Sequence, residues 1–302
     1  MYKTFYGLHD WPFSITPDRH FFVHLSTHLS CFKKLQTFVG GDEAMALVTG
    51  DIGAGKTLMS QKLIKYLKTQ DALVIELHNP ILGAIALQKH LAQGLQIKTS
   101  HYPNQDIVAL IYQKLVERFH RKQLVILIID EAQNLPEDTL EAVRILTNLV
   151  IQQHRLLKVV FFAESSFIEK LQKPNCLALW QRVSEHVVLE NLSLDELAHY
   201  VHQRLVRAGY HGADLLSSRA YQVLYQWTAG VPRLVNRVMH PLLEIAAEQQ
   251  KKTIDHKLVM IVAENNLGKP LQHKPMVSWL TPVGVAASFA ALTWWYWAAA
   301  HS

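Results

Sequence analysis

The chain contains little cysteine and no recognisable export signal. Its 302 residues include 2 cysteines, which is too few for a disulfide framework or a cysteine-based zinc site. The 17 histidines are scattered without the spacing of metal ligands. The first residues lack the apolar core of a signal peptide, and no internal repeat is present. These absences exclude a small secreted scaffold and a repeat protein, and they are typical of a reducing compartment.

Charged residues are also scarce. They make up 18% of the chain, whereas hydrophobic residues make up 49%, a balance that excludes a disordered protein. A chain of this length buries a large core and usually forms two or more domains. The formal net charge of +5 permits contact with nucleic acid or an anionic membrane but requires neither. No segment is dense in Arg and Lys, so nucleic acid is not an expected partner.

The most informative motif is rich in glycine. It reads Gly50-Asp51-Ile52-Gly53-Ala54-Gly55-Lys56-Thr57, which is the G-x-x-x-x-G-K-T spacing of a phosphate-binding loop. The apolar run 45–49 precedes it, and a helical pattern begins at Leu58. Strand, loop and helix in this order aim backbone N–H groups and a helix N-terminus at an anion. We therefore predict that residues 50–58 bind a nucleotide, with Lys56 at the β- and γ-phosphates and Thr57 holding Mg²⁺.

Two carboxylates form the second motif. The unbroken apolar run 124–129 ends in Asp130-Glu131, as expected of a strand buried on both faces of a parallel sheet. Ligands bind at the C-terminal ends of such strands. Two acidic residues there could simply cap the next turn. Beside a phosphate loop, however, Asp130 is predicted to hold Mg²⁺ through water, and Glu131 to orient and polarise an attacking water.

Strand and helix patterns alternate along the first two thirds of the chain. This alternation predicts a five-stranded parallel sheet covered on both faces by helices. The strands are expected at 45–49, 72–77, 124–129, 158–163 and 186–190, and the helices near 25–38, 82–95, 105–121 and 137–152. After Ser193, which resembles a helix cap, only helices are expected. These lie near 194–208, 214–228, 232–249 and 254–265.

The segment 276–300 contains no charged residue. Crossing a bilayer needs roughly 20 residues, and tryptophans near both ends of the segment suit the two membrane interfaces. Lys269 and Lys274 precede it, so the positive-inside rule keeps the large N-terminal part in the cytoplasm. We expect a single transmembrane helix here. A buried core helix and an interfacial helix that lies flat are the alternatives.

Several segments taken together resemble the AAA+ ATPases of the ExeA/GspA general-secretion family, and within it the MSHA pilus (MshM) branch. The phosphate loop alone is shared by many protein families, whereas the combination is far more specific. The matching segments are 1–8, 12–18, 130–135, 144–149 and 230–236. The resemblance implies an α/β P-loop NTPase of the AAA+ type, a three-layer sandwich followed by a helical lid subdomain and the C-terminal transmembrane helix.

Three further site residues follow from the resemblance alone. Arg233 stands where these proteins carry a second sensor that reaches the γ-phosphate from the lid, although a surface ion pair would also explain it. Arg182 stands at the position of an arginine finger that acts on the ATP of a neighbouring subunit. The fourth strand usually ends in Gly-Gln, but here Ala163-Glu164 follow it. An ionised Glu164 accepts hydrogen bonds but donates none, which puts the rate of hydrolysis in doubt.

The implied organisation divides the chain into five parts. Residues 1–40 form an N-terminal segment of the ATPase module, 41–191 the AAA+ core, 192–268 the lid, 269–275 a linker and 276–300 the membrane helix. The chain ends at His301-Ser302, so we expect no peptidoglycan-binding domain of its own.

The expected protein is a membrane-anchored ATPase that hydrolyses ATP with Mg²⁺. It would support assembly of a type IV (MSHA-like) pilus or a type II secretion apparatus. We expect a homo-oligomer in the bacterial inner membrane, with pilus or secretion assembly proteins as partners. Two alternatives stay open. One is a DNA-acting AAA+ ATPase of the transposition-helper type, and the other is an ATP-binding switch with negligible turnover.

Overall fold

The computed structural model describes residues 2–14, 21, 23, 25–78, 80–98 and 106–271. The chain divides after Pro270 into two units, and the helices and strands below belong to the first. Within the described ranges, no helix is long and apolar enough to cross a membrane. The predicted span 276–300 lies outside these ranges, as do residues 15–18 of the N-terminal motif, so the membrane helix stays a prediction.

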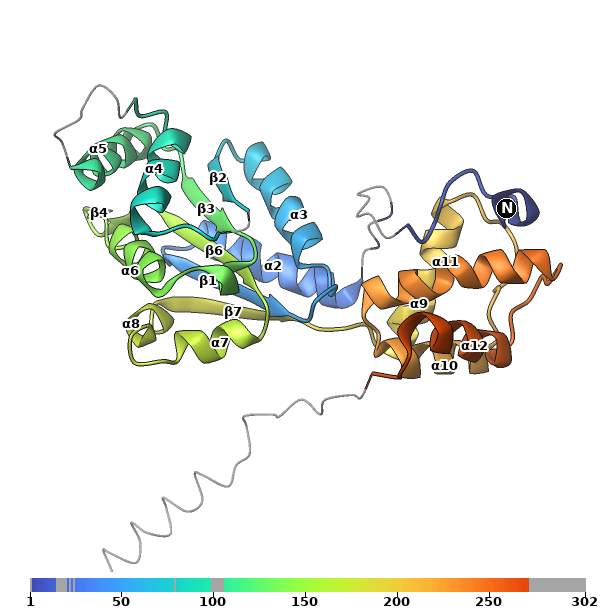
Figure 1. Cartoon of the computed structure of the whole chain (residues 1–302). Coiled ribbons are helices and arrows are strands. Elements are labelled where there is room, and N and C mark those ends of the chain that lie inside the picture. Colours follow the sequence, from blue (N-terminus) through green and yellow to red (C-terminus); the bar gives the residue numbers. More distant parts are fainter. Residues whose placement is uncertain are drawn as a thin grey trace, which may run out of the picture. The chain divides into compact units, whose positions relative to one another are not determined.

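A five-stranded sheet forms the centre of the ATPase core (Figure 1). Its strand order is β2-β3-β6-β1-β7, and every neighbouring pair is parallel. The predicted parallel five-stranded sheet is therefore confirmed. The strands are β1 (Met45–Gly50), β2 (Leu73–Leu77), β3 (Val125–Ile129), β6 (Lys158–Ala163) and β7 (Val183–Leu189). Strands β1, β3 and β6 are buried at every residue, which explains their unbroken apolar runs.

Helices cover both faces of the sheet. Alternate residues of β1 enter opposite layers, because side chains alternate along a strand: Leu47 joins one hydrophobic cluster and Val48 the other. The layer with Val48 contains α2 (Ser26–Gly40) and α3 (Lys56–Thr69). The layer with Leu47 contains α4 (Ala84–Gly94), α5 (Ile107–His120), α6 (Glu137–Leu146), α7 (Ser166–Leu171) and α8 (Leu177–Trp180).

One predicted helix is too long. The helix expected at 137–152 ends at Leu146, and β4 (Val150–Ile151) pairs with β5 (His154–Arg155) in an antiparallel hairpin. The prediction was wrong over 147–152. The two turn residues, Gln152 and Gln153, have φ angles of 46° and 71°, as a two-residue hairpin turn requires. Glutamine is not a usual residue for that turn, so no residue preference predicted the hairpin.

The helices after Ser193 pack into a separate hydrophobic cluster. They are α9 (Leu194–Arg207), α10 (Ser218–Thr228), α11 (Pro232–Glu248) and α12 (His256–Leu267). Ser193 and Glu196 form a reciprocal capping box at the start of α9. The boundaries predicted for the lid, 192–268, stay a prediction.

The N-terminal segment packs into the lid rather than onto the sheet. Tyr2, in α1 (Tyr2–Tyr6), and Phe13 are fully buried in the hydrophobic cluster of the lid helices. The Tyr2 hydroxyl lies 3.0 Å from Nδ1 of His240 on α11. The chain therefore crosses from the lid to the core between α1 and α2.

Glu196 ties the lid to α2. Its Oε1 accepts hydrogen bonds from the hydroxyls of Ser26 (2.6 Å) and Thr27 (3.3 Å). Burial opposes ionisation of this carboxyl, but the hydrogen bonds from Ser26, Ser193 and Thr27 outweigh it and lower the pKa of Glu196. The first turn of the lid is thus anchored to the core next to the phosphate loop.

Candidate nucleotide site

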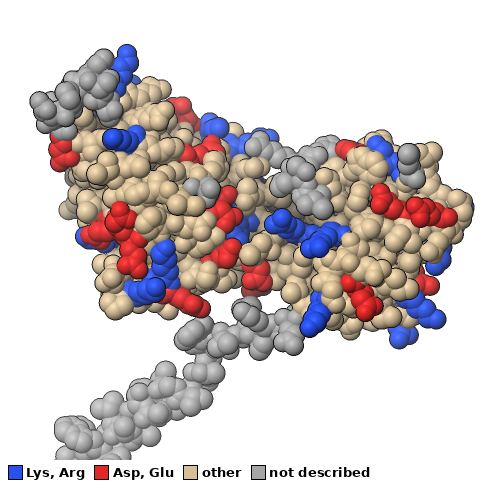
Figure 2. All heavy atoms as spheres, in the orientation of Figure 1, with Lys and Arg blue, Asp and Glu red and all other residues tan. Residues whose placement is uncertain are grey.

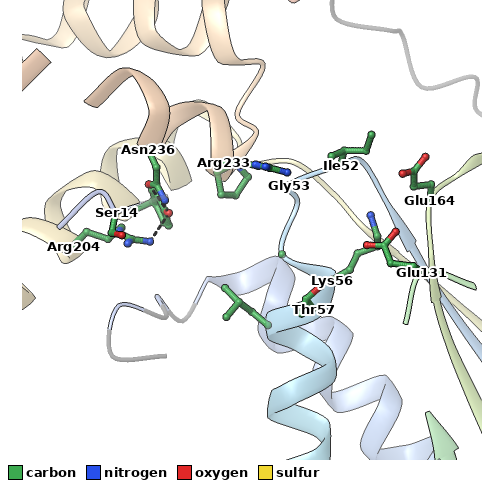
Figure 3. Close-up of a pocket in the computed structure, with 14 residues that line it drawn as sticks. Ser14, Ile52, Gly53, Lys56, Thr57, Glu131, Glu164, Arg204, Arg233 and Asn236 are labelled. Carbon is green, nitrogen blue, oxygen red and sulfur yellow. Dashed lines mark hydrogen bonds between the residues drawn. The ribbon is translucent and has the colours of Figure 1, made fainter. Parts of the chain in front are cut away.

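The phosphate loop lies at the C-terminal edge of the sheet, between β1 and α3. Its Gly53 and Gly55 have φ angles of 88° and 105°, which side chains rarely tolerate. A cavity of about 320 Å³ opens over the loop (Figure 3). Lys56 of the loop lines it together with three predicted site residues from distant parts of the chain: Glu131, Glu164 and Arg233.

Lys56 is buried, with 6% of its surface exposed. Its Nζ donates to the backbone oxygens of Gly50 (2.9 Å) and Asp51 (3.0 Å). Burial lowers the pKa of Lys56, and the nearby carboxylates of Glu131 and Glu164 oppose that shift. The loop thus holds its ammonium group facing an acidic edge of the cavity.

Thr57 and Asp130 lie side by side at the end of the loop. The Thr57 hydroxyl hydrogen bonds to the Asp130 carboxylate, and the Glu131 backbone N–H donates to Asp130 Oδ1 over 3.0 Å. Burial raises the pKa of Asp130, and these hydrogen bonds oppose that shift.

This pair fits Mg²⁺, which prefers oxygen ligands and usually binds through one or two carboxylates together with substrate phosphates. In the part of the chain that the structure describes, no group of three His, Cys, Asp or Glu residues could hold a metal alone.

Glu131 begins a tight turn that aims its side chain at the cavity. Its φ and ψ are 55° and 40°, a left-handed conformation that costs a non-glycine residue about 1 kcal/mol or more. The short helix η3 (Ala132–Asn134) follows. Its Gln133 contacts both Glu131 and Glu164. No role for Gln133 is predicted from the sequence, and its position two residues after the proposed base is the available signal.

Arg233 approaches the loop from the lid. It lies in the first turn of α11, which Pro232 opens, and it points toward Gly53 in Figure 3. A Cβ added at Gly53 would lie 2.6 Å from the Arg233 Cβ. The loop and the lid therefore meet closely enough that only glycine fits at Gly53.

Arg182 lies away from the cavity. It follows α8, and its guanidinium donates to the side chain of Asn148. Burial lowers the pKa of Arg182, and the charges of Arg144 and Arg155 lower it further. Arg182 does not line the cavity, so within one subunit it is not brought to the other predicted site residues.

A polar network on the lid side of the cavity was not predicted from the sequence. Arg204 is buried and donates to the Tyr200 hydroxyl over 2.8 Å and to the Pro12 carbonyl oxygen. The Tyr200 hydroxyl donates to Asn236 Oδ1 over 2.9 Å. The Tyr200–Arg204 spacing puts both on one face of α9, which was the only signal available. This network fixes Pro12 against the lid.

Comparison with known proteins agrees with this geometry. The family described as "AAA domain" matches residues 40–171. General secretion pathway protein A of Aeromonas hydrophila is 28% identical over 301 residues, which is 98% of this chain and 54% of the relative. Together with the AAA-domain match, this similarity supports the ExeA/GspA family of AAA+ ATPases. The chain spans about half the length of that relative. The finer MSHA branch stays a prediction.

Solved structures share the fold of this ATPase. Cdc6p of Pyrobaculum aerophilum matches with a TM-score of 0.63 at 16% identity, over 85% of this chain and 70% of its own. ORC2 of Aeropyrum pernix matches with a TM-score of 0.60 at 12% identity, over 85% and 73%. The RuvB branch migration motor of Thermotoga maritima matches with a TM-score of 0.52 at 16% identity, over 78% and 68%. At these identities the likeness establishes the fold alone.

Proposed function

We propose that this protein binds and hydrolyses ATP with Mg²⁺ in the cavity between the phosphate loop and the lid. One observation carries the proposal: Lys56, Glu131, Glu164 and Arg233 line a single cavity although they come from separate segments. A site that hydrolyses ATP needs phosphate-binding groups and a water-activating group at one place, and these side chains are of the types that can supply both.

The roles within the site follow from the contacts. The loop N–H groups and Lys56 bind the phosphates, which replace the carbonyl partners that Lys56 has now. Thr57 and Asp130 would hold Mg²⁺, which when bound would neutralise phosphate charge. Glu131 accepts the proton of the attacking water. Arg233 contacts the γ-phosphate from the lid and so couples the nucleotide to the lid angle.

Arg182 serves a second copy of the chain in this proposal. It lies outside its own cavity, next to Arg144 and Arg155, so a homo-oligomer would bring it to a neighbour's ATP. A guanidinium there would stabilise the charge that grows in the transition state.

The cellular role is proposed from the relative and from the sequence. The relative carries the name general secretion pathway protein A, which supports a role in assembling a type II secretion apparatus or a related pilus. The uncharged segment 276–300 supports a tether to the bacterial inner membrane with the ATPase core in the cytoplasm. Inner-membrane assembly proteins are then the partners whose conformation changes when the lid moves.

Two substitutions test the ATPase proposal. Lys56→Ala should abolish nucleotide binding. Glu131→Gln should keep the nucleotide Kd within about twofold and lower phosphate release at least about a hundredfold, because general-base catalysis contributes about 10²–10⁴-fold. Radioactive nucleotide binding and steady-state phosphate release on the full chain measure both. Unchanged phosphate release by Glu131→Gln would remove Glu131 from the role of base.

A DNA-acting ATPase is the second candidate. ORC1 of Aeropyrum pernix, solved in complex with DNA, matches with a TM-score of 0.54 at 17% identity, over 84% of this chain and 69% of its own. On the face in Figure 2, however, acidic and basic side chains are interspersed rather than gathered into one basic surface. A full chain that stays out of the membrane fraction and shifts duplex DNA would favour this candidate.

A further inference from the structure

Gln133 joins the two acidic residues that face the cavity. Its Nε2 donates to Glu131 Oε2 over 2.6 Å, and its Oε1 accepts from the backbone N–H of Glu164 over 3.1 Å. An amide nitrogen only donates and an amide oxygen only accepts. Because the Glu164 N–H needs an acceptor, the amide cannot turn round. Its donor end therefore stays aimed at Glu131.

The backbone around Gln133 is also fixed. Lys170 on α7 donates from Nζ to the carbonyl oxygen of Gln133 over 3.1 Å and to that of Leu135. The turn before it starts with Glu131 in a left-handed conformation. These contacts hold both the backbone and the side chain of Gln133, so its position relative to Glu131 is set before any ligand binds.

The side chain at the end of β6 does not supply such a donor. Glu164 lines the cavity, but a carboxylate offers acceptors only. We propose that Gln133 provides the hydrogen-bond donor beside Glu131 that Glu164 cannot provide, and so acts as a positioning residue for the water-activating carboxylate. The amide occupies Oε2 of Glu131 and leaves Oε1 to accept the proton of water. This inference rests on the proposed ATP hydrolysis.

Two variants separate the donor from the acceptor of this amide. Gln133→Glu keeps an acceptor for the Glu164 N–H but loses the donor, and Gln133→Met loses both. On the full chain we expect each to lower kcat for ATP about ten- to a hundredfold, since hydrogen bonds to charged groups are the strong ones. The nucleotide Kd should stay within about twofold. Gln172→Glu, an exposed position at the end of α7, is the charge-matched control and should keep the wild-type kcat.

A second-site change distinguishes positioning from a structural role. Adding Glu164→Gln to Gln133→Met puts a neutral donor at the end of β6, and we expect kcat to recover at least fivefold. A structural role predicts no recovery, because Gln133 contacts only the backbone of Glu164. Three results would each overturn the inference. One is a wild-type kcat in Gln133→Glu, and another is a nucleotide Kd that rises in either variant in step with the loss of kcat. The third is a kcat that does not recover in the double variant. A wild-type chain no faster than Lys56→Ala would overturn the proposed hydrolysis with it.

Discussion

Among the glycines that the structure describes, Gly230 is the one where an added methyl group should lower the free energy of unfolding most. It directly precedes Val231, which caps α11 and its Arg233. Its φ is 70°, and its carbonyl accepts a hydrogen bond from the Leu192 N–H over 3.0 Å. A Cβ built on Gly230 would overlap the carbonyl oxygen of Leu192 and lie 2.9 Å from its carbonyl carbon. Both contacts are with backbone atoms, which cannot rotate away as the end of a flexible side chain can. The segment itself must therefore shift.

The cost of Gly230→Ala has separable parts. A left-handed conformation costs an alanine about 1–2 kcal/mol. Relief of the overlap costs about 1–3 kcal/mol by analogy with overpacked cores, and loss of the bond from Leu192 adds about 1 kcal/mol. We therefore expect the free energy of unfolding to fall by about 3 kcal/mol or more.

Gly7→Ala is the matched control. Gly7 has a φ of 69°, but nothing lies within 4 Å of a Cβ added there. It should show the conformational cost alone, about 1–2 kcal/mol. Urea unfolding of both full-length variants, followed by circular dichroism, measures the difference. If Gly230→Ala lowered the free energy of unfolding no more than Gly7→Ala, the close approach of Leu192 would be refuted.

Four further predictions concern charged side chains. Asp130→Asn should raise the Tm of the ligand-free chain at neutral pH, because burial raises the pKa of Asp130 above 3.8 and its ionisation therefore destabilises the fold. The gain in Tm should vanish below about pH 3.8, where Asp130 is protonated in both the folded and the unfolded chain. Glu196→Ala should cost about 1–2 kcal/mol near neutral pH, and this difference should fade as the pH falls through the lowered pKa of Glu196. Arg182→Ala should slow phosphate release at least about a hundredfold. Mixing Arg182→Ala subunits with Glu131→Gln subunits should restore part of the rate, because the second variant still carries Arg182. If the rate were not restored, Arg182 would not act between subunits. Lys158→Met should cost about 3 kcal/mol in urea unfolding, because three backbone carbonyls lose their donor.

The sheet was predictable where burial is complete. Strands β1, β3 and β6 lie between two helical layers, so their sequences are apolar at nearly every position and need no tertiary information. The hairpin at Gln152-Gln153 was not predictable, because the turn uses residues without a strong preference for positive φ. The packing of Tyr2 into the lid depends on contacts with residues far along the chain, which no local pattern contains.

The site was predictable to a similar degree. The loop and Asp130-Glu131 have fixed spacings because backbone geometry around phosphate dictates them. Arg182 and Arg233 could be proposed only from the resemblance, since a lone arginine has no distinguishing pattern. The bridge made by Gln133 required the side-by-side placement of β3 and β6, and that pairing is a property of the folded sheet.

The burial of Tyr2 has a consequence for the order in which the chain folds. Tyr2 is synthesised before its partner His240, which follows more than two hundred residues later. During synthesis, the strands of the sheet emerge before α11 does, so the core can fold while Tyr2 still lacks its partners in the lid. The lid helices then pack around a segment that was synthesised much earlier, and forming contacts between residues so far apart in sequence is slow. A chain arrested before α11 would therefore expose Tyr2 and Phe13 to chaperones and proteases.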